Sequence, residues 1–170
     1  MSDISWHPVK YDAVWPAQFE VIAGQLGQAL DGQFIGIEHV GSTSVPGLVA
    51  KPIIDVNIVI SSRFMLPEVI TRLAALGYLH KGDKGVPGRE AFAWSGGPPR
   101  RHLYVSAVDT PNLYMQLLFR DYLRLHPGAA KAYGELKLKL ARSHPHDREA
   151  YTEAKTDFIQ GVLRRAQTAL

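Results

Sequence analysis

The segment from residue 41 to residue 51 is a loop of small and hydroxyl residues that ends in a lysine. Gly41 permits a close approach of the backbone. Ser42, Thr43 and Ser44 add three hydroxyls and their amides, which are donors of the kind that cradle a phosphate group. Lys51 adds a positive charge. The segment predicts a phosphate-binding loop, although a Gly-Ser-Thr-Ser run is also typical of a turn that satisfies its own backbone.

Two pairs of polar residues on neighbouring strand segments extend this candidate site. Asp55 and Asn57 are two residues apart on an apolar strand, so they share a face, and so do His102 and Tyr104 on a later strand. Asp55 can serve as a catalytic carboxylate and an Mg²⁺ ligand, with Asn57 offering an uncharged carbonyl oxygen. If the two faces adjoin, His102 can act as a general base or metal ligand. The alternative is that these are buried polar groups paired within the sheet.

Arginines after flexible segments are further candidates for anion binding. Arg89 follows a Pro-Gly pair, and Arg100 and Arg101 follow Gly-Gly-Pro-Pro. Arginines on such loops can clamp a phosphate or carboxylate with two hydrogen bonds. We predict Arg101 as a phosphate ligand and interpret Arg100 as surface charge.

Other polar residues are interpreted as structural. Glu38 and His39 point to opposite faces of their strand, so one of them at most faces the loop's pocket. Tyr151 and Lys155 lie four residues apart on a helical segment, and they are interpreted as packing contacts rather than as ligands.

Hydrophobic periodicity outlines the elements that must position these residues. Apolar residues at three- and four-residue steps predict a helix over 11–30, and β-branched runs predict strands over 34–40 and 53–60. A short helix over 66–76, an irregular stretch over 78–88 and strands over 90–94 and 101–108 follow. From residue 112 onward the pattern predicts three helices, separated at Pro127 and Pro145.

Composition narrows the class of protein. The 170 residues contain no cysteine, which excludes disulfides, thiolate metal sites and cysteine nucleophiles. No stretch approaches the ~20 consecutive apolar residues of a membrane span. The first residues lack a basic region followed by an apolar run, so we expect a cytoplasmic protein. The net charge is +3, and no basic tract of the kind that binds nucleic acid is present, so we expect neither a nucleic-acid nor a membrane partner.

The site motif also resembles a known superfamily. Gly41-Ser42, a gap of twelve residues and then Asp55-Val56-Asn57 is similar to the nucleotidyltransferase pattern. The longer string Glu-His-Val-Gly-Ser-Thr-Ser-Val-Pro-Gly-Leu-Val-Ala-Lys-Pro-Ile-Ile-Asp, residues 38–55, resembles the GrpB family within that superfamily. Segments 87–89, 101–105, 118–127 and 151–158 also look like GrpB, so the resemblance covers nearly the whole chain.

The resemblance implies an α+β fold, with a nucleotidyltransferase-like mixed β-sheet flanked by helices and a C-terminal helical subdomain. Residues 1–110 would form the core, and residues 111–170 would form the subdomain packed on it, within one compact domain. In the superfamily, the Gly-Ser loop holds a nucleoside triphosphate while two or three carboxylates hold two Mg²⁺ ions. This chain has Asn57 where the second carboxylate belongs, and its His102-Leu103-Tyr104-Val105 strand has no acid for the third.

Three functions follow as alternatives. The chain either transfers a nucleotidyl or phosphoryl group to an acceptor, binds a nucleotide or phosphate with a degenerate metal site, or acts as a partner domain, since GrpB-like domains also occur fused to dephospho-coenzyme A kinase. We predict a phosphate-bearing small molecule or nucleotide at Gly41-Ser42, facing Asp55, with His102 and Tyr104 opposite. Mg²⁺ is expected to bind weakly unless the nucleotide's phosphates complete its shell.

Overall fold

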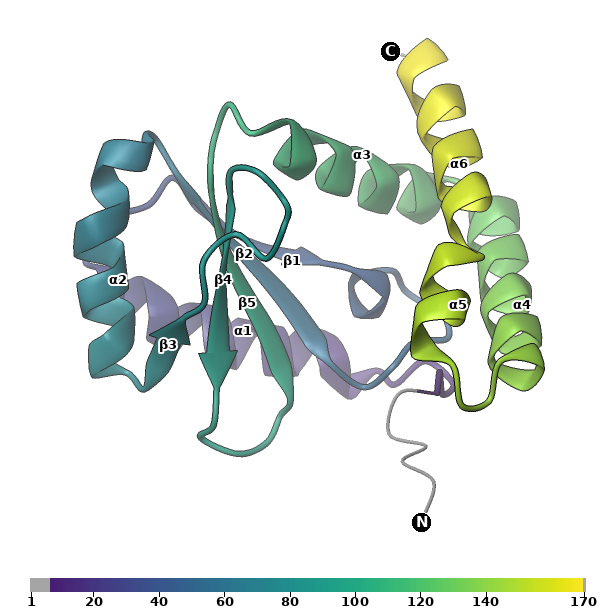
Figure 1. Ribbon diagram of the computed structural model, residues 1–170, viewed down its shortest axis with the longest axis horizontal. Helices are drawn as coiled ribbons and strands as arrows, with labels where there is room; N and C mark the ends of the chain where they lie inside the picture. Colours follow the sequence, from purple (N-terminus) through teal and green to yellow (C-terminus); the bar gives the residue numbers. More distant parts are fainter. Residues whose placement is uncertain (1–6, 170) are drawn as a thin grey trace.

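The computed structural model describes residues 7–169, and a single five-stranded sheet forms its centre (Figure 1). The strands are β1 (Gly36–Val40), β2 (Ile54–Ile60), β3 (Tyr78–His80), β4 (Arg89–Trp94) and β5 (Arg101–Ala107), in the order β1-β2-β5-β4-β3. β2 and β5 run parallel, and the other neighbours run antiparallel. This confirms the predicted mixed sheet, with the first two strand segments as neighbours.

One face of the sheet packs against two helices, α1 (Val14–Leu30) and α2 (Leu66–Ala75). Alternate residues of β2, such as Val56 and Ile58, join a buried cluster with Ile22 and Leu26 of α1 and with α2. Full burial of an aliphatic side chain of this size stabilises the fold by roughly 1.5–3 kcal/mol. Because side chains alternate along a strand, the intervening residues of β2 point to the opposite face.

The register of the sheet brings the predicted polar pairs together on that opposite face. Asp55 lies directly across from His102 of β5, and Asn57 lies across from Tyr104. On the other side of β2, Asn57 is opposite Glu38 of β1. The shared face that the sequence predicts for these residues is therefore present.

Four helices complete the chain: α3 (Pro111–Leu125), α4 (Pro127–Ser143), α5 (Arg148–Glu153) and α6 (Thr156–Thr168). Figure 1 shows α4, α5 and α6 gathered at one end of the molecule. A short 3₁₀ helix, η2 (Ser42–Ser44), links β1 to the loop before β2, and η3 (Arg63–Met65) precedes α2.

Two elements differ from the sequence prediction. The predicted third C-terminal helix is divided into α5 and α6, because Tyr151 packs against Leu140 and Ala141 while Phe158 packs in a separate cluster with Tyr133. The chain bends between these two contacts. The stretch from residue 78, predicted to be irregular, begins with β3, which pairs with the end of β4.

Within residues 7–169, no helix is long and apolar enough to cross a membrane. Residues 1–6, from which the absence of a targeting signal was inferred, lie outside the described residues. The division into a core and a helical subdomain near residue 110 stays a prediction.

Candidate phosphate-binding site

Gly41 sets the position of the loop that follows β1. Its φ of +71° lies in the region that favours glycine. A Cβ atom added there would overlap the Asp55 carboxylate. Glycine thus allows the loop backbone to lie directly against the acidic residue of β2.

The hydroxyls of Thr43 and Ser44 hold the loop in place. Thr43 Oγ1 lies 2.9 Å from His39 Nε2, within hydrogen-bond distance, and His39 stacks on Phe19 of α1. Burial, assisted by nearby arginines, lowers the pKa of His39 to about 4, so the ring stays neutral. Ser44 Oγ donates to the carbonyl of Gly41 at 2.5 Å. The Thr43 and Ser44 side chains are therefore engaged within the protein, and Ser42 is the hydroxyl that contacts the lysine of α4 described next.

A cavity of about 190 Å³ opens beside this loop. We call it the lysine pocket, because Lys51, Lys137 and Lys155 line it together with Ser42, Asp55 and His102. The three lysines come from the loop before β2, from α4 and from the junction between α5 and α6. Three separate segments thus bring positive charge to one small cavity.

Lys137 is the most buried of the three, with only 3% of its surface exposed. Its ammonium donates to Ser42 Oγ at 2.9 Å and to the carbonyl oxygen of Val49. Burial is the largest cause that lowers the pKa of Lys137 to about 7. Repulsion from Lys155 and Lys51 acts in the same direction, and the Asp55 carboxylate acts in the opposite direction. Lys137 therefore titrates close to neutral pH.

Lys51 and Lys155 share the ring of Tyr151. Their ammonium nitrogens lie 5.1 Å and 4.4 Å from its centroid, which is cation–π geometry. Burial lowers the pKa of Lys155 to about 8 and also lowers that of Lys51, and repulsion from Arg148 adds to both shifts. Burial raises the pKa of Tyr151 to about 12, so its ring remains neutral between the two cations.

Asp55 and His102 form a pair at the wall of the pocket. His102 Nδ1 lies 2.8 Å from Asp55 Oδ1, and the side chains are 44% and 26% exposed, respectively. When Nδ1 carries the proton donated to Asp55, the other ring nitrogen of His102 is left as a proton acceptor. Among the described residues that line the pocket, Asp55 is the only carboxylate.

Asn57 and Tyr104 share the face of Asp55 but do not line the lysine pocket. Asn57 is fully buried and donates through Nδ2 to Gln116 Oε1 of α3 at 2.9 Å, while no described residue donates to its Oδ1. Tyr104 lies under the guanidinium of Arg89, 4.3 Å from its ring centroid. Burial is the largest cause that raises the pKa of Tyr104, and the negative charge of Asp55 raises it as well.

Arg101 does not line the lysine pocket. Its guanidinium stacks on Trp94, 4.5 Å from the ring centroid, and donates to Tyr78 Oη at 3.2 Å. Arg101 is opposite Ile54 in the register, and Ile54 belongs to the core beneath α1. The structure therefore places this predicted phosphate ligand on the other face of the sheet.

The donor set does not fit the magnesium site predicted at Asp55. Hard cations need several anionic oxygens, and here Asp55 is paired with His102 while Asn57 is buried against Gln116. Across residues 7–169, no group of three or more histidine, aspartate or glutamate side chains could hold a metal ion.

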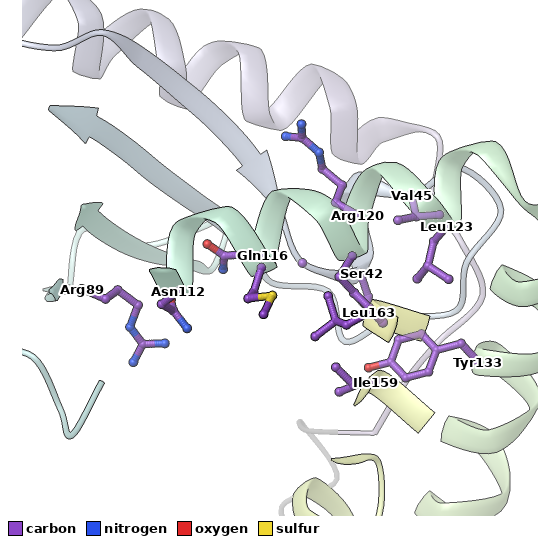
Figure 2. A pocket seen from close by; sticks show the side chains of 13 residues that line it. Ser42, Val45, Arg89, Asn112, Gln116, Arg120, Leu123, Tyr133, Ile159 and Leu163 are labelled. Atoms are coloured by element: carbon purple, nitrogen blue, oxygen red, sulfur yellow. The ribbon is translucent and has the colours of Figure 1, made fainter. Parts of the chain in front are cut away.

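Gly41 and Ser42 also line a second cavity of about 320 Å³, which we call the helical cavity (Figure 2). Ser42 lines both cavities. Figure 2 shows Arg89 and Asn112 at one end and Tyr133 and Ile159 at the other. The side chains along it are largely apolar, with a few polar groups, as is usual for sites that bind the organic part of a ligand.

The comparisons with known proteins identify the chain's relatives. The model of the GrpB protein family matches residues 7–165. The chain belongs to the GrpB family. It is similar to the crystal structure of GrpB from Enterococcus faecalis, with a TM-score of 0.85 and 32% identity over 95% of this chain and 98% of that one.

A curated GrpB relative from Pseudomonas aeruginosa, named as a UPF0157 protein, is 40% identical over 93% of this chain. The chain spans between 46% and 66% of the length of the first curated relatives it matches. The Cid1 poly(U) polymerase, in a crystal structure bound to MgATP, gives a TM-score of 0.60 at 12% identity over 85% of this chain and 50% of that one. The fold of this GrpB chain is therefore nucleotidyltransferase-like.

Lys137 and Lys155 are the site residues that sequence reasoning missed. Lys137 follows Tyr133 by four residues and precedes Leu140 by three, so it lies on the stripe that buries both of them. A lysine on the apolar face of a predicted helix was the sequence signal that could have indicated a buried charge. Lys155 was recognised beside Tyr151 but was interpreted as a packing residue, and the structure places it at the wall of the pocket.

Proposed function

We propose that this chain binds the phosphate groups of a nucleotide or another phosphorylated small molecule in the lysine pocket. One observation carries the proposal. Lys51, Lys137 and Lys155 converge from three separate segments on one cavity that Ser42 also lines, with a single carboxylate among the lining residues.

The energetics of the lysines support an anionic ligand. Burial and mutual repulsion disfavour the charged forms of Lys137 and Lys155, so an arrangement that holds them together weakens the fold unless something compensates. A phosphate chain would favour all three charges at once, and its oxygens would accept hydrogen bonds from the ammonium groups. Binding would therefore stabilise the protein and raise the pKa values of the lysines.

The two cavities support a ligand larger than inorganic phosphate. Because Ser42 lines both of them, a phosphate chain in the lysine pocket would leave its organic end near the helical cavity. The apolar side chains of Phe119 and Leu163 and the polar side chains of Asn112 and Gln116 offer a surface and hydrogen-bonding groups to a flat heterocycle. Nucleotides combine these two parts.

Calorimetric titration with ATP and with tripolyphosphate tests the proposal, in buffers with and without Mg²⁺. We expect binding in at least one buffer, and a loss of roughly tenfold or more in affinity for Lys137→Met or Lys155→Met. Lys139→Met is the matched control, because Lys139 is an exposed lysine on the same helix as Lys137. Absence of binding in both buffers, or equal losses in the control, would contradict the proposal.

The Asp55–His102 pair favours group transfer as a second candidate function. In such a step an acceptor hydroxyl oxygen would bond to a phosphorus of a nucleoside triphosphate, the bond to the bridging oxygen would break, and diphosphate or a nucleoside diphosphate would leave. His102 would take the hydroxyl proton on the ring nitrogen that does not face Asp55. Incubating radiolabelled ATP with candidate acceptors tests this function. A labelled product that forms with the wild type and not with His102→Gln would support group transfer. The absence of a product with every acceptor would argue for binding alone.

A further inference from the structure

The lysine pocket is poor in the oxygen ligands that a divalent cation needs. Oδ1 of its one carboxylate, Asp55, lies 2.8 Å from His102 Nδ1, within hydrogen-bond distance. The residue two positions along the same strand, Asn57, is fully buried and turned to Gln116. A cation in the pocket would therefore find a single carboxylate of the protein, and Oδ1 of this carboxylate already lies within hydrogen-bond distance of His102.

The same pocket is rich in cationic groups. The ammonium of Lys137 reaches Ser42 Oγ from α4, while those of Lys51 and Lys155 lie against the ring of Tyr151. A free divalent cation would be repelled by the charged forms of these lysines, whereas a phosphate chain would favour those forms and be neutralised by them. The pKa values agree with this reading, because repulsion among the lysines is one cause of the lowering at Lys137 and at Lys155.

We infer that the phosphate chain binds here without a divalent cation, because the ammonium groups of Lys51, Lys137 and Lys155 take the metal's place in neutralising it. The inference rests on the proposed phosphate-binding function and extends it to the ionic form of the ligand. The ligand is the metal-free polyanion rather than its magnesium complex. Magnesium, which removes negative charge from ATP, should therefore weaken binding.

Parallel titrations with ATP, one with excess EDTA and one with excess Mg²⁺, test this inference on the full chain. We expect binding in EDTA and an affinity lower by roughly tenfold in Mg²⁺. Binding that requires Mg²⁺ would overturn the inference and leave the proposed function standing. No binding in either buffer would overturn the proposed function itself, so the two failures are distinguishable.

Asp55→Asn gives a second, independent test in EDTA. If no metal takes part, removing the pocket's carboxylate removes a repulsive charge. In a buffer acidic enough to keep Lys137 charged without Asp55, tripolyphosphate should therefore bind several-fold more tightly. Asp109→Asn is the control, because Asp109 is exposed in the turn before α3. A thermal melt of each variant checks that it is folded. Loss of binding in folded Asp55→Asn, with Asp109→Asn unchanged, would assign Asp55 to a metal or ligand contact and overturn the inference.

Discussion

Replacing Lys137 with methionine should change how stability depends on pH. The lysine is 3% exposed, and its pKa of about 7 lies well below the ordinary value of 10.5. Between these two values the unfolded chain binds more protons than the folded one, so the free energy of unfolding of the wild type rises with pH. Methionine has a similar length and no charge, so this contribution disappears in the variant.

The magnitude follows from the two pKa values. A full proton of difference between the folded and unfolded states changes the free energy of unfolding by about 1.4 kcal/mol per pH unit. Over the roughly three units between pH 7 and pH 10, the stability of Lys137→Met relative to wild type should therefore fall by about 4 kcal/mol. The hydrogen bonds to Ser42 and Val49 are lost at every pH and shift the whole difference without changing its slope.

Denaturant unfolding at a series of pH values, with wild type and variant side by side, measures this slope. The other titratable groups near Lys137 are present in both proteins, so the difference contains the titration of Lys137 and its coupling to them; they are Lys51, Asp55, Tyr133, Tyr151 and Lys155. Lys139→Met is the control and should give a flat difference, because its side chain is exposed. A flat difference for Lys137→Met as well would refute the reasoning, since the lysine would then keep an ordinary pKa in the folded state.

Three further predictions concern the loop, the ligand and the C-terminal helices. Gly41→Ala should lower the free energy of unfolding by roughly 2–3 kcal/mol in denaturant unfolding. The loss should exceed that of Gly47→Ala, because Gly47 also has a positive φ but has open space around it. Equal losses would argue against the contact with Asp55. Tripolyphosphate affinity should fall as pH rises from about 6.5 to about 9, because Lys137 and Lys155 lose their charges, and a pH-independent affinity in calorimetry would contradict this. Deleting residues 128–170 should expose buried apolar surface and cause aggregation in size-exclusion chromatography, whereas a soluble, cooperatively unfolding truncation would show that residues 7–127 fold alone.

The sequence predicted the frame of the site because that frame depends on local rules. Alternation along a strand places Asp55 with Asn57 and His102 with Tyr104, and the sheet register confirms that the pairs are neighbours. The same rule also excludes Arg101 from that face, because it precedes His102 by one residue. The prediction of Arg101 as a ligand relied on its loop setting, and the register places Arg101 on the opposite face from His102.

The cationic part of the site depends on tertiary packing that no local pattern contains. Lys137 and Lys155 line the lysine pocket only because α4, α5 and α6 pack beside the loop, with a bend between Tyr151 and Phe158. The burial of Asn57 likewise depends on where α3 places Gln116. Periodicity predicts that such helices have buried faces, but it does not predict which residues of other elements those faces meet.

The most direct test of the central claim is to follow the lysine side chains themselves during ligand binding. Nuclear magnetic resonance of carbon-13-labelled lysines gives the pKa of Lys137, with Lys137→Met assigning its signal, before and after saturation with tripolyphosphate. We expect the pKa of Lys137 to begin near 7 and to rise by roughly one unit or more when the anion binds, because the bound phosphates favour the charged form. A signal that titrates identically with and without tripolyphosphate would contradict the assignment of this pocket to phosphate binding.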